Sequence, residues 1–237
     1  MRSRLAGLAA LLGMSMAAPA GAAQVDVTSV VGVWTSSDAS ITGLSTNAVQ
    51  WGIAASGSGR SGYTFDGAAP PNLGPLTPNV GVVVGEFTHN NFPIFDDGAI
   101  PTRIELVVTV QGTISEGAQS TGFTLFDTLD FGHFETPNTA SPCAAGGVSP
   151  CPDQVTLTQV NVPDVTIDFL GVTYGFNVNG FLNGSNQVVN QILTLENAVN
   201  TVNIQGVFTA TAVPLPAGHW FLIAALGAFA YVSRRSI

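Results

Sequence analysis

The nine residues Thr102–Val110 read TRIELVVTV, and they decide the fold class of this chain. Ile104, Leu106 and Val108 are apolar, and they alternate with Arg103, Glu105 and Val107, of which the first two are charged. In an extended strand every second side chain lies on the same face, so this alternation indicates a half-buried β-strand. The stretch predicts a strand with one face in a core and one in solvent.

The same pattern recurs along the chain. Four further stretches are rich in β-branched and aromatic residues: Val80–Phe87, Gln154–Val160, Val165–Phe169 and Asn203–Ala210. Asn179-Gly180 and Asn183-Gly184 are dipeptides typical of tight turns, and we expect them to bracket Phe181-Leu182. Between the chain ends no stretch shows helical spacing, so we predict an all-β fold, a β-sandwich with a jelly-roll-like arrangement.

Charge is distributed unevenly along the 237 residues. All six basic residues are arginines, and only Arg60 and Arg103 lie away from the two ends. The fifteen acidic residues all lie between Asp26 and Glu196. Two arginines cannot form a basic patch, so nucleic acid and anionic membrane surfaces are excluded as expected partners.

The N-terminus has the three zones of a secretory signal peptide. A basic start, Met1–Arg4, precedes the apolar stretch Leu5–Met16, and small residues follow from Ala17 to Ala23. That order predicts an N-terminal signal helix over residues 1–23, cut by signal peptidase near Ala22 or Ala23. The alternative is a buried N-terminal helix of the folded domain.

The C-terminus carries a second hydrophobic segment. Val213-Pro214-Leu215-Pro216 forms a stiff spacer because each proline fixes φ and removes a donor. Residues 217–232 contain no formal charge, and Arg234-Arg235 follows. As a helix of about 24 Å this segment could cross a thinned bilayer with its arginines on the cytoplasmic side. We predict a transmembrane helix over 217–232; the alternative is a C-terminal core helix.

This tail resembles the VPLPA variant of the PEP-CTERM sorting signal. The motif residues are Val213, Pro214, Leu215, Pro216 and Ala217, followed by the apolar span and by Arg234 and Arg235. The resemblance implies recognition by an exosortase in a Gram-negative bacterium. The chain would be exported across the inner membrane and held there by its tail. It would then be cut near the motif and placed at the cell surface or outside the cell.

Removing both ends leaves an ectodomain of residues 24–212, a usual size for one all-β domain. Its only two cysteines, Cys143 and Cys151, lie in an irregular segment over residues 136–153. In an exported protein an isolated cysteine pair predicts a disulfide. The alternative, a metal or redox pair, is disfavoured because the spacing is not C-x-x-C.

Several segments of this ectodomain resemble the choice-of-anchor K domain, an extracellular module found with alternative C-terminal anchors. They occur in the family's order, and they are Trp51-Gly52, Ser61–Gly67, Gly85–Ile94, Glu135–Asn138, Cys151–Asp153, and Thr194–Asn197 with Asn200. The resemblance implies an all-β surface domain. It implies no particular activity.

One cluster of potential metal ligands stands out in Phe126–Glu135. Asp127, Asp130, His133 and Glu135 lie within this segment, and carboxylate oxygens are the ligands that Ca²⁺ prefers. In an extended strand 127, 133 and 135 share a face and 130 points away. We therefore consider a Ca²⁺ site here, with solvated acids on a strand face as the alternative.

A second polar run, Phe87–Ile94, contains His89, Asn90 and Asn91. These side chains could contact a sugar or an ion, but a His/Asn run more often forms a turn through side-chain to backbone hydrogen bonds. Aromatic residues could stack on a sugar, although in a sandwich they are more often core residues. The four considered are Trp34, Trp51, Tyr63 and Tyr174.

The sequence contains no catalytic motif. There is no G-x-S-x-G, no P-loop and no G-x-G-x-x-G. The function we expect is therefore a non-catalytic, exosortase-sorted surface or matrix protein associated with extracellular polysaccharide or biofilm. The alternatives are a Ca²⁺-dependent carbohydrate-binding module and, third, a polysaccharide hydrolase or lyase that uses two carboxylates.

Overall fold

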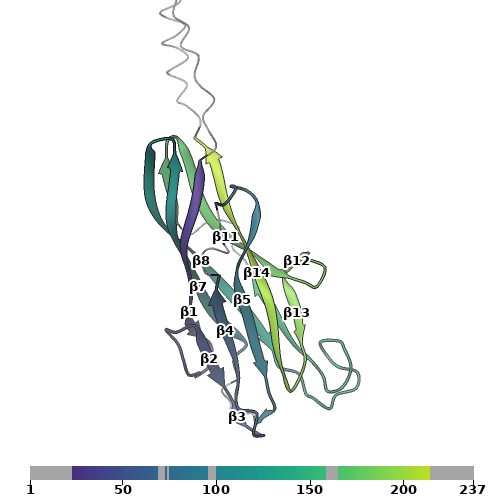
Figure 1. The fold of residues 1–237 in the computed structure, drawn as a ribbon. Coiled ribbons are helices and arrows are strands. Elements are labelled where there is room, and N and C mark those ends of the chain that lie inside the picture. Colours follow the sequence, from purple (N-terminus) through teal and green to yellow (C-terminus); the bar gives the residue numbers. More distant parts are fainter. Residues whose placement is uncertain (1–22, 69–72, 74, 96–99, 159–164, 214–237) are drawn as a thin grey trace, which may run out of the picture.

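The computed structural model describes residues 23–68, 73, 75–95, 100–158 and 165–213, and this part of the chain is all-β (Figure 1). One antiparallel sheet has five strands, in the order β1 (Gln24–Ser37), β7 (Arg103–Glu116), β8 (Gln119–Phe134), β9 (Asp153–Thr158) and β13 (Gln191–Thr194). The second sheet has the order β10 (Thr166–Phe169), β11 (Val172–Leu182), β14 (Ala198–Ala212), β5 (Gly81–Asn91), β4 (Ser61–Gly67) and β2 (Ala48–Trp51). The short β12 (Val188–Val189) pairs with β11, and β3 (Ile53–Ala54) pairs with β6 (Ile94–Phe95).

The core lies between these two sheets. Trp34 of β1 packs on Tyr63 of β4 with ring centroids 5.6 Å apart, so the first strand of one sheet contacts the second sheet directly. Phe131 of β8 stacks on Phe87 of β5 at 5.1 Å. All four rings are fully buried, and aromatic pairs of this kind add to the free energy gained from burial alone. Two curled sheets that pack face to face agree with the predicted β-sandwich.

The predicted strands are confirmed. The stretch that predicts a strand at Thr102–Val110 lies almost wholly in β7, where Ile104, Leu106, Val108 and Val110 are all buried. The other four stretches overlap β5, β9, β10 and β14. Alternation was a good guide because each strand has one face on the shared core.

One of the two predicted turns is wrong. Asn179-Gly180 lies inside β11, where the pairing with β14 shifts register between Val178 and Gly180. The residues form a bulge, and Gly180 supplies a positive φ of 148° that few other residues adopt. Asn183-Gly184 does form a turn after β11, in which the Asn183 side chain accepts hydrogen bonds from the backbone N–H groups of Ser185 and Gln187.

The described chain begins and ends at the same end of the molecule (Figure 1). Gln24 pairs with Ser115, beside the turn that joins β7 to β8. Ala212 is the last residue of β14, and the first residue of that strand, Ala198, pairs with Asn91 at the far end of β5. We call the end that carries Asn91 and the β8–β9 loop the distal end.

The predicted disulfide is confirmed: Cys143 and Cys151 are bonded, with their Cα atoms 5.3 Å apart. The bond closes a nine-residue ring in the loop that joins β8 to β9, which is worth about 2.6 kcal/mol in the chain-entropy model. Because Asp153 follows Cys151 by two residues, the disulfide also fixes the start of β9.

The targeting segments fall mostly outside the described residues. The predicted signal helix over 1–23, the motif residues Pro214 to Ala217, the predicted transmembrane helix over 217–232 and the pair Arg234-Arg235 all belong there, apart from Ala23. Val213 is described, and its N–H donates to the Gly171 carbonyl. Among the described residues, no helix has the length and apolar character needed to cross a membrane.

Candidate functional site

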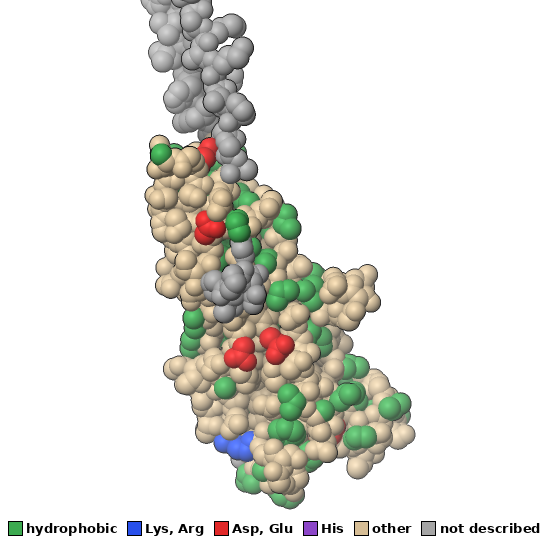
Figure 2. Space-filling model, viewed as in Figure 1, with side chains coloured by type: hydrophobic (Ala, Val, Ile, Leu, Met, Phe, Trp, Pro, Cys, Tyr) green, Lys and Arg blue, Asp and Glu red, His purple; other side chains and the backbone are tan. Residues whose placement is uncertain are grey.

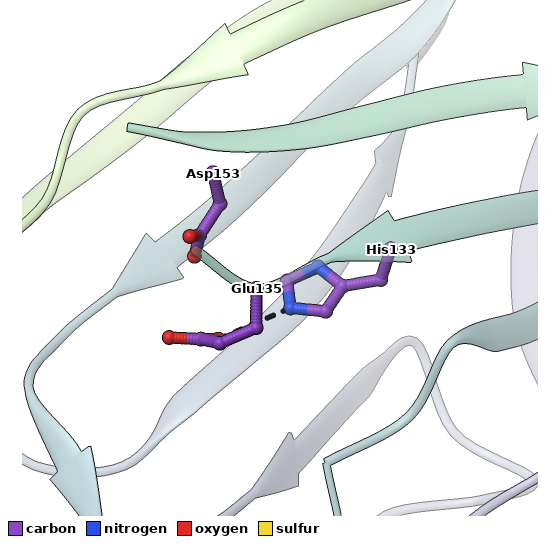
Figure 3. A group of neighbouring side chains, drawn as sticks. All are labelled: His133, Glu135 and Asp153. Atoms are coloured by element: carbon purple, nitrogen blue, oxygen red, sulfur yellow. Dashed lines mark hydrogen bonds and ion pairs between the residues drawn. The ribbon is translucent and has the colours of Figure 1, made fainter. Parts of the chain in front are cut away.

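A group of potential ligand atoms lies at the distal end, and we call His133, Glu135 and Asp153 the distal cluster (Figure 3). His133 is near the end of β8, and Glu135 follows two residues later on the same side. Asp153 is the first residue of β9, the strand that pairs with β8. One ligand atom from each residue lies within 4.8 Å of the others.

His133 is buried and hydrogen-bonded at both ring nitrogens. Its Nδ1 lies 2.6 Å from the Tyr63 hydroxyl, and its Nε2 lies 3.2 Å from Glu135 Oε2. Burial lowers the pKa of the imidazole to about 4, although the charges of Asp153 and Asp38 act in the opposite direction. The ring is therefore neutral at pH 7, and it does not neutralise the neighbouring carboxylates.

Asp153 is fully buried. Its Oδ1 accepts hydrogen bonds from the backbone N–H of Thr136 at 2.8 Å and from the Thr136 hydroxyl at 3.2 Å. Its Oδ2 is inaccessible to solvent and has no hydrogen-bond partner among the described residues. Burial, together with the charge of Glu135, raises the pKa of this carboxyl to about 6.

Glu196, in the turn between β13 and β14, interacts electrostatically with the distal cluster but is not one of its grouped ligand residues. Both of its carboxylate oxygens are inaccessible and accept no hydrogen bond of good geometry from the described residues. Burial raises the pKa of Glu196 to about 7, and the charges of Asp153 and Glu135 add to the rise. The nearby Asn138 side chain lowers it only in part.

No basic side chain offsets this negative charge within the described chain. Arg60 donates to the carbonyls of Gly52 and Gln50, and Arg103 pairs with Asp130 and Glu105 on the surface. Two like charges 4.8 Å apart repel by about 3.5 kcal/mol at an effective dielectric constant of about 20. A bound proton or a bound cation would relieve this repulsion.

His89 and Asn91 lie beside the distal cluster, but not in the turn that we predicted. Both are in β5, where they continue the buried face begun by Phe87. His89 Nδ1 lies 2.9 Å from the Thr194 hydroxyl, and Asn91 donates to the Thr194 carbonyl. The rings of His89 and His133 are 5.4 Å apart. Burial lowers the pKa of His89 well below its usual value.

The remaining predicted residues lie away from the distal cluster. Asp127 shares a face with His133 but lies six residues along β8, roughly 20 Å away. Its Oδ2 accepts a hydrogen bond from the Val178 N–H at 2.6 Å. Asp130 faces away, as expected, and pairs with Arg103. Asn90 lies on the opposite face of β5 from His89. Of the proposed Ca²⁺ ligands, the structure therefore brings His133 and Glu135 together. It does not bring in Asp127, which lies too far along the strand, or Asp130, which faces the other way.

The aromatic residues do not form a sugar-stacking surface. Trp34, Trp51 and Tyr63 are fully buried, and Tyr174 is 3% exposed. Trp51 and Tyr63 instead surround the two histidines, with Trp51 and His133 ring centroids 5.1 Å apart. These rings cover the side of the distal cluster that faces the core.

Sequence reasoning missed Asp153 and Glu196. Both lie in segments that carry the resemblance to the choice-of-anchor K domain, Cys151–Asp153 and Thr194–Asn197. Two more of those segments, Gly85–Ile94 and Glu135–Asn138, supply His89, Asn91, Glu135 and Thr136. These four segments taken together could have indicated the site, because each of them contributes a polar side chain to the distal end.

Two pockets open near the distal cluster. A pocket of about 300 Å³ is lined by Glu135 and Asn138 with Ile94, Ile100, Thr136 and Pro137, and it gives solvent access to Glu135. A larger pocket of about 510 Å³ is lined in part by Thr194, the residue that hydrogen-bonds with His89 and Asn91. Its polar lining consists of Asn183, Asn186, Thr194, Asn200, Thr201 and Asn203, and its apolar lining includes Leu182, Ile192 and Val202.

This arrangement can hold a cation or a proton, and the larger pocket can hydrogen-bond a polar ligand. A comparison with protein-family models finds no match, and a comparison with curated proteins finds none either. The function of the chain is therefore argued from its own residues.

Proposed function

We propose that this protein is a non-catalytic, exosortase-sorted cell-surface or matrix protein whose sandwich, jelly-roll-like in topology, is associated with extracellular polysaccharide or biofilm. The order of an N-terminal signal segment and a VPLPA-type tail supports export and sorting. The signal peptidase and the exosortase are the processing partners that this order implies.

The observation that carries the proposal is the position of the distal cluster. Both ends of the described chain leave the sandwich together, whereas the distal cluster lies at the opposite end (Figure 1). Strand β14 has 15 residues and runs from one end toward the other, up to roughly 45 Å. A domain tethered through its C-terminal segment would hold this polar end away from the tether.

The composition of the surface supports contact with an uncharged polar partner such as a polysaccharide. Figure 2 shows a face made mostly of uncharged polar side chains and backbone, with scattered hydrophobic and acidic residues and a small basic area near its lower edge. Such a surface hydrogen-bonds readily, and its basic area is too small to favour nucleic acid.

The geometry does not favour a two-carboxylate glycosidase at the distal cluster. That chemistry needs both carboxyl groups beside the scissile bond. Asp153 is fully buried behind Thr136, so a sugar in the smaller pocket would meet Glu135 but not Asp153.

Carbohydrate recognition is the second candidate, and the amide-lined pocket is the observation that favours it. The exposed side chains of Asn186, Thr201 and Asn203 offer donors and acceptors to sugar hydroxyls, while Leu182, Ile192 and Val202 offer an apolar surface. The pocket lies between β13, β14 and the turn after β11.

Replacing Pro214 and Pro216 by alanine is expected to leave the tail uncut and the protein in the membrane fraction. The substitutions change the motif that the processing enzyme is proposed to read, and they leave the described sandwich intact. Mass spectrometry of the producing cells measures the outcome, with Pro137→Ala as a proline control in an exposed loop. An intact 214–237 segment on all mature wild-type copies would contradict the sorting proposal.

Binding to the producer's own polysaccharide is expected to depend on the amide-lined pocket. Asn186→Ala together with Asn203→Ala removes two amides and should weaken binding about tenfold, since each lost hydrogen bond costs about 0.5–1.5 kcal/mol. Gln119→Ala is the control, because Gln119 is the first residue of β8 and does not line the pocket. A pull-down run in Ca²⁺ and again in EDTA measures retention. Equal binding by all variants would place the contact elsewhere, and no binding in either condition would favour a protein partner.

A further inference from the structure

We propose that His133, Glu135 and Asp153 bind one divalent first-row transition-metal ion, most simply Zn²⁺. The inference concerns a site at the distal end and is independent of how the protein is sorted. It also does not depend on the amide-lined pocket being a sugar site.

The donor spacing suits such an ion. Zn²⁺ binds imidazole nitrogen and carboxylate oxygen at about 2.0–2.2 Å in a tetrahedron, so its ligand atoms are about 3.3 Å apart. His133 Nε2 and Glu135 Oε2 are 3.2 Å apart already. The ligand atoms of the cluster all lie within 4.8 Å of one another, and the Glu135 side chain, which is 22% exposed, can move to close the remaining gap.

The groups behind the ligands are arranged to orient them. A metal-binding histidine usually passes its second ring N–H to an acceptor that fixes the ring. Here the Tyr63 oxygen lies 2.6 Å from Nδ1 and can accept that proton once Nε2 binds the metal. Thr136 holds one oxygen of Asp153 with two hydrogen bonds and leaves the other oxygen unpaired.

The buried Asp153 Oδ2 is the observation that points to a ligand independently of the grouping. A buried carboxylate oxygen without a hydrogen bond is costly, and native proteins rarely keep one. Figure 3 shows the Asp153 carboxylate on the side of Glu135 and the His133 ring. A cation at this point would satisfy Oδ2 and would also supply the positive charge that neither Arg60 nor Arg103 provides among the described residues.

The donor set favours a transition metal over the Ca²⁺ that the sequence suggested. Ca²⁺ takes six to eight oxygen ligands, whereas an imidazole among few carboxylates suits Zn²⁺ and its neighbours. Replacing Asp127 and Asp130 by Asp153 in the ligand set leaves one nitrogen and two carboxylates, three protein ligands with a fourth position open to water or an external ligand.

The ion would link two neighbouring strands at the distal end, because His133 belongs to β8 and Asp153 to β9. The ion would reach the site through the smaller pocket, where Glu135 is the exposed ligand.

The test is calorimetric titration of Zn²⁺ into the full-length chain, purified in detergent and stripped with EDTA. The expected result is saturation at one ion per chain. Glu135→Gln is expected to weaken binding at least tenfold, the change typical of removing a group that supports a metal. Asp130→Asn is the matched control, because it removes a carboxylate of the same strand outside the cluster.

A stability measurement on the metal-free proteins shows whether a variant that does not bind metal is still folded. Glu135→Gln removes one of three mutually repelling carboxylates, so its unfolding midpoint without metal should equal or exceed that of the wild type. Zn²⁺ should then raise the midpoint of the wild type and of Asp130→Asn but not of Glu135→Gln. No saturable binding, equal binding by Glu135→Gln, or saturation by Ca²⁺ with none by Zn²⁺ would each overturn the proposal.

Discussion

Replacing Asp127 by alanine is expected to destabilise the sandwich by about 3 kcal/mol. The Asp127 side chain is 1% exposed and projects from β8 of one sheet to the Val178 N–H of β11 in the other, over 2.6 Å. Alanine removes this hydrogen bond to a carboxylate, which contributes about 1.5–3 kcal/mol, and it leaves a small cavity between the sheets. Chemical denaturation followed by tryptophan fluorescence measures the change.

Asp127→Asn is the matched control for this prediction. Asparagine has nearly the same shape, and its amide oxygen can still accept the hydrogen bond, so we expect a loss of about 1 kcal/mol. Neither variant should change Zn²⁺ binding at the distal cluster, which is roughly 20 Å away along β8. An alanine variant as stable as the wild type would show that the contact between β8 and β11 contributes nothing net.

The position of Val178 explains why this aspartate is in the core. Val178 lies at the register shift of β11, where the bulge interrupts pairing with β14. Bulges leave a backbone group out of the ladder, and a neighbouring side chain commonly satisfies it. Asp127 is thus a structural residue of the fold, and its sequence neighbourhood with Asp130 and His133 misled the prediction of a metal site.

The strands could be predicted from sequence because their signal is local. Alternation in Thr102–Val110 or Val165–Phe169 follows from having one buried face, and it needs no knowledge of the partner strand. Pairing could not be predicted in the same way. β1 pairs with β7 and β14 pairs with β5 across most of the chain, and only packing between distant segments sets those registers.

The distal cluster was predictable in part for the same reason. His133 and Glu135 share a face by simple parity, and the structure keeps them together at 3.2 Å. Asp153 joins them only because β9 pairs with β8, and Glu196 comes near enough to interact electrostatically only through the turn between β13 and β14. Neither condition is visible in a window of neighbouring residues.

At His89 and Asn91 the composition of the segment misled the prediction, whereas its periodicity was the better guide. The run of histidine and asparagines is typical of a turn, yet residues 87, 89 and 91 continue the buried face of β5 in steps of two. The burial is tolerated because Thr194 offers a hydroxyl to His89 and a carbonyl to Asn91. Polar residues in alternating register after an apolar strand are therefore a better sign of a buried polar site than of a loop.

The second large effect is expected for Gly112→Ala, which should destabilise the fold by about 3 kcal/mol, the upper range for overpacking. A Cβ at Gly112 would lie 2.1 Å from the backbone oxygen of Asp26 in β1 and 2.6 Å from the Phe123 ring. Backbone oxygen cannot move away without breaking the pairing of β1 with β7, in which Val27 is opposite Gly112. The cost arises from contact between strands, because Gly112 adopts no positive φ that would demand glycine.

Gly122→Ala is the matched control, and we expect it to be neutral or stabilising by up to about 1 kcal/mol. Its added Cβ would meet only the Gly112 oxygen at 3.8 Å, which is ordinary contact, and alanine reduces the entropy of the unfolded chain. Both glycines lie in the β7–β8 hairpin, so urea unfolding compares the same substitution in one local setting. Equal stability of the two variants would mean that β1 can shift to admit a methyl group, and the close approach of β1 to β7 would not be a constraint that the sequence must keep.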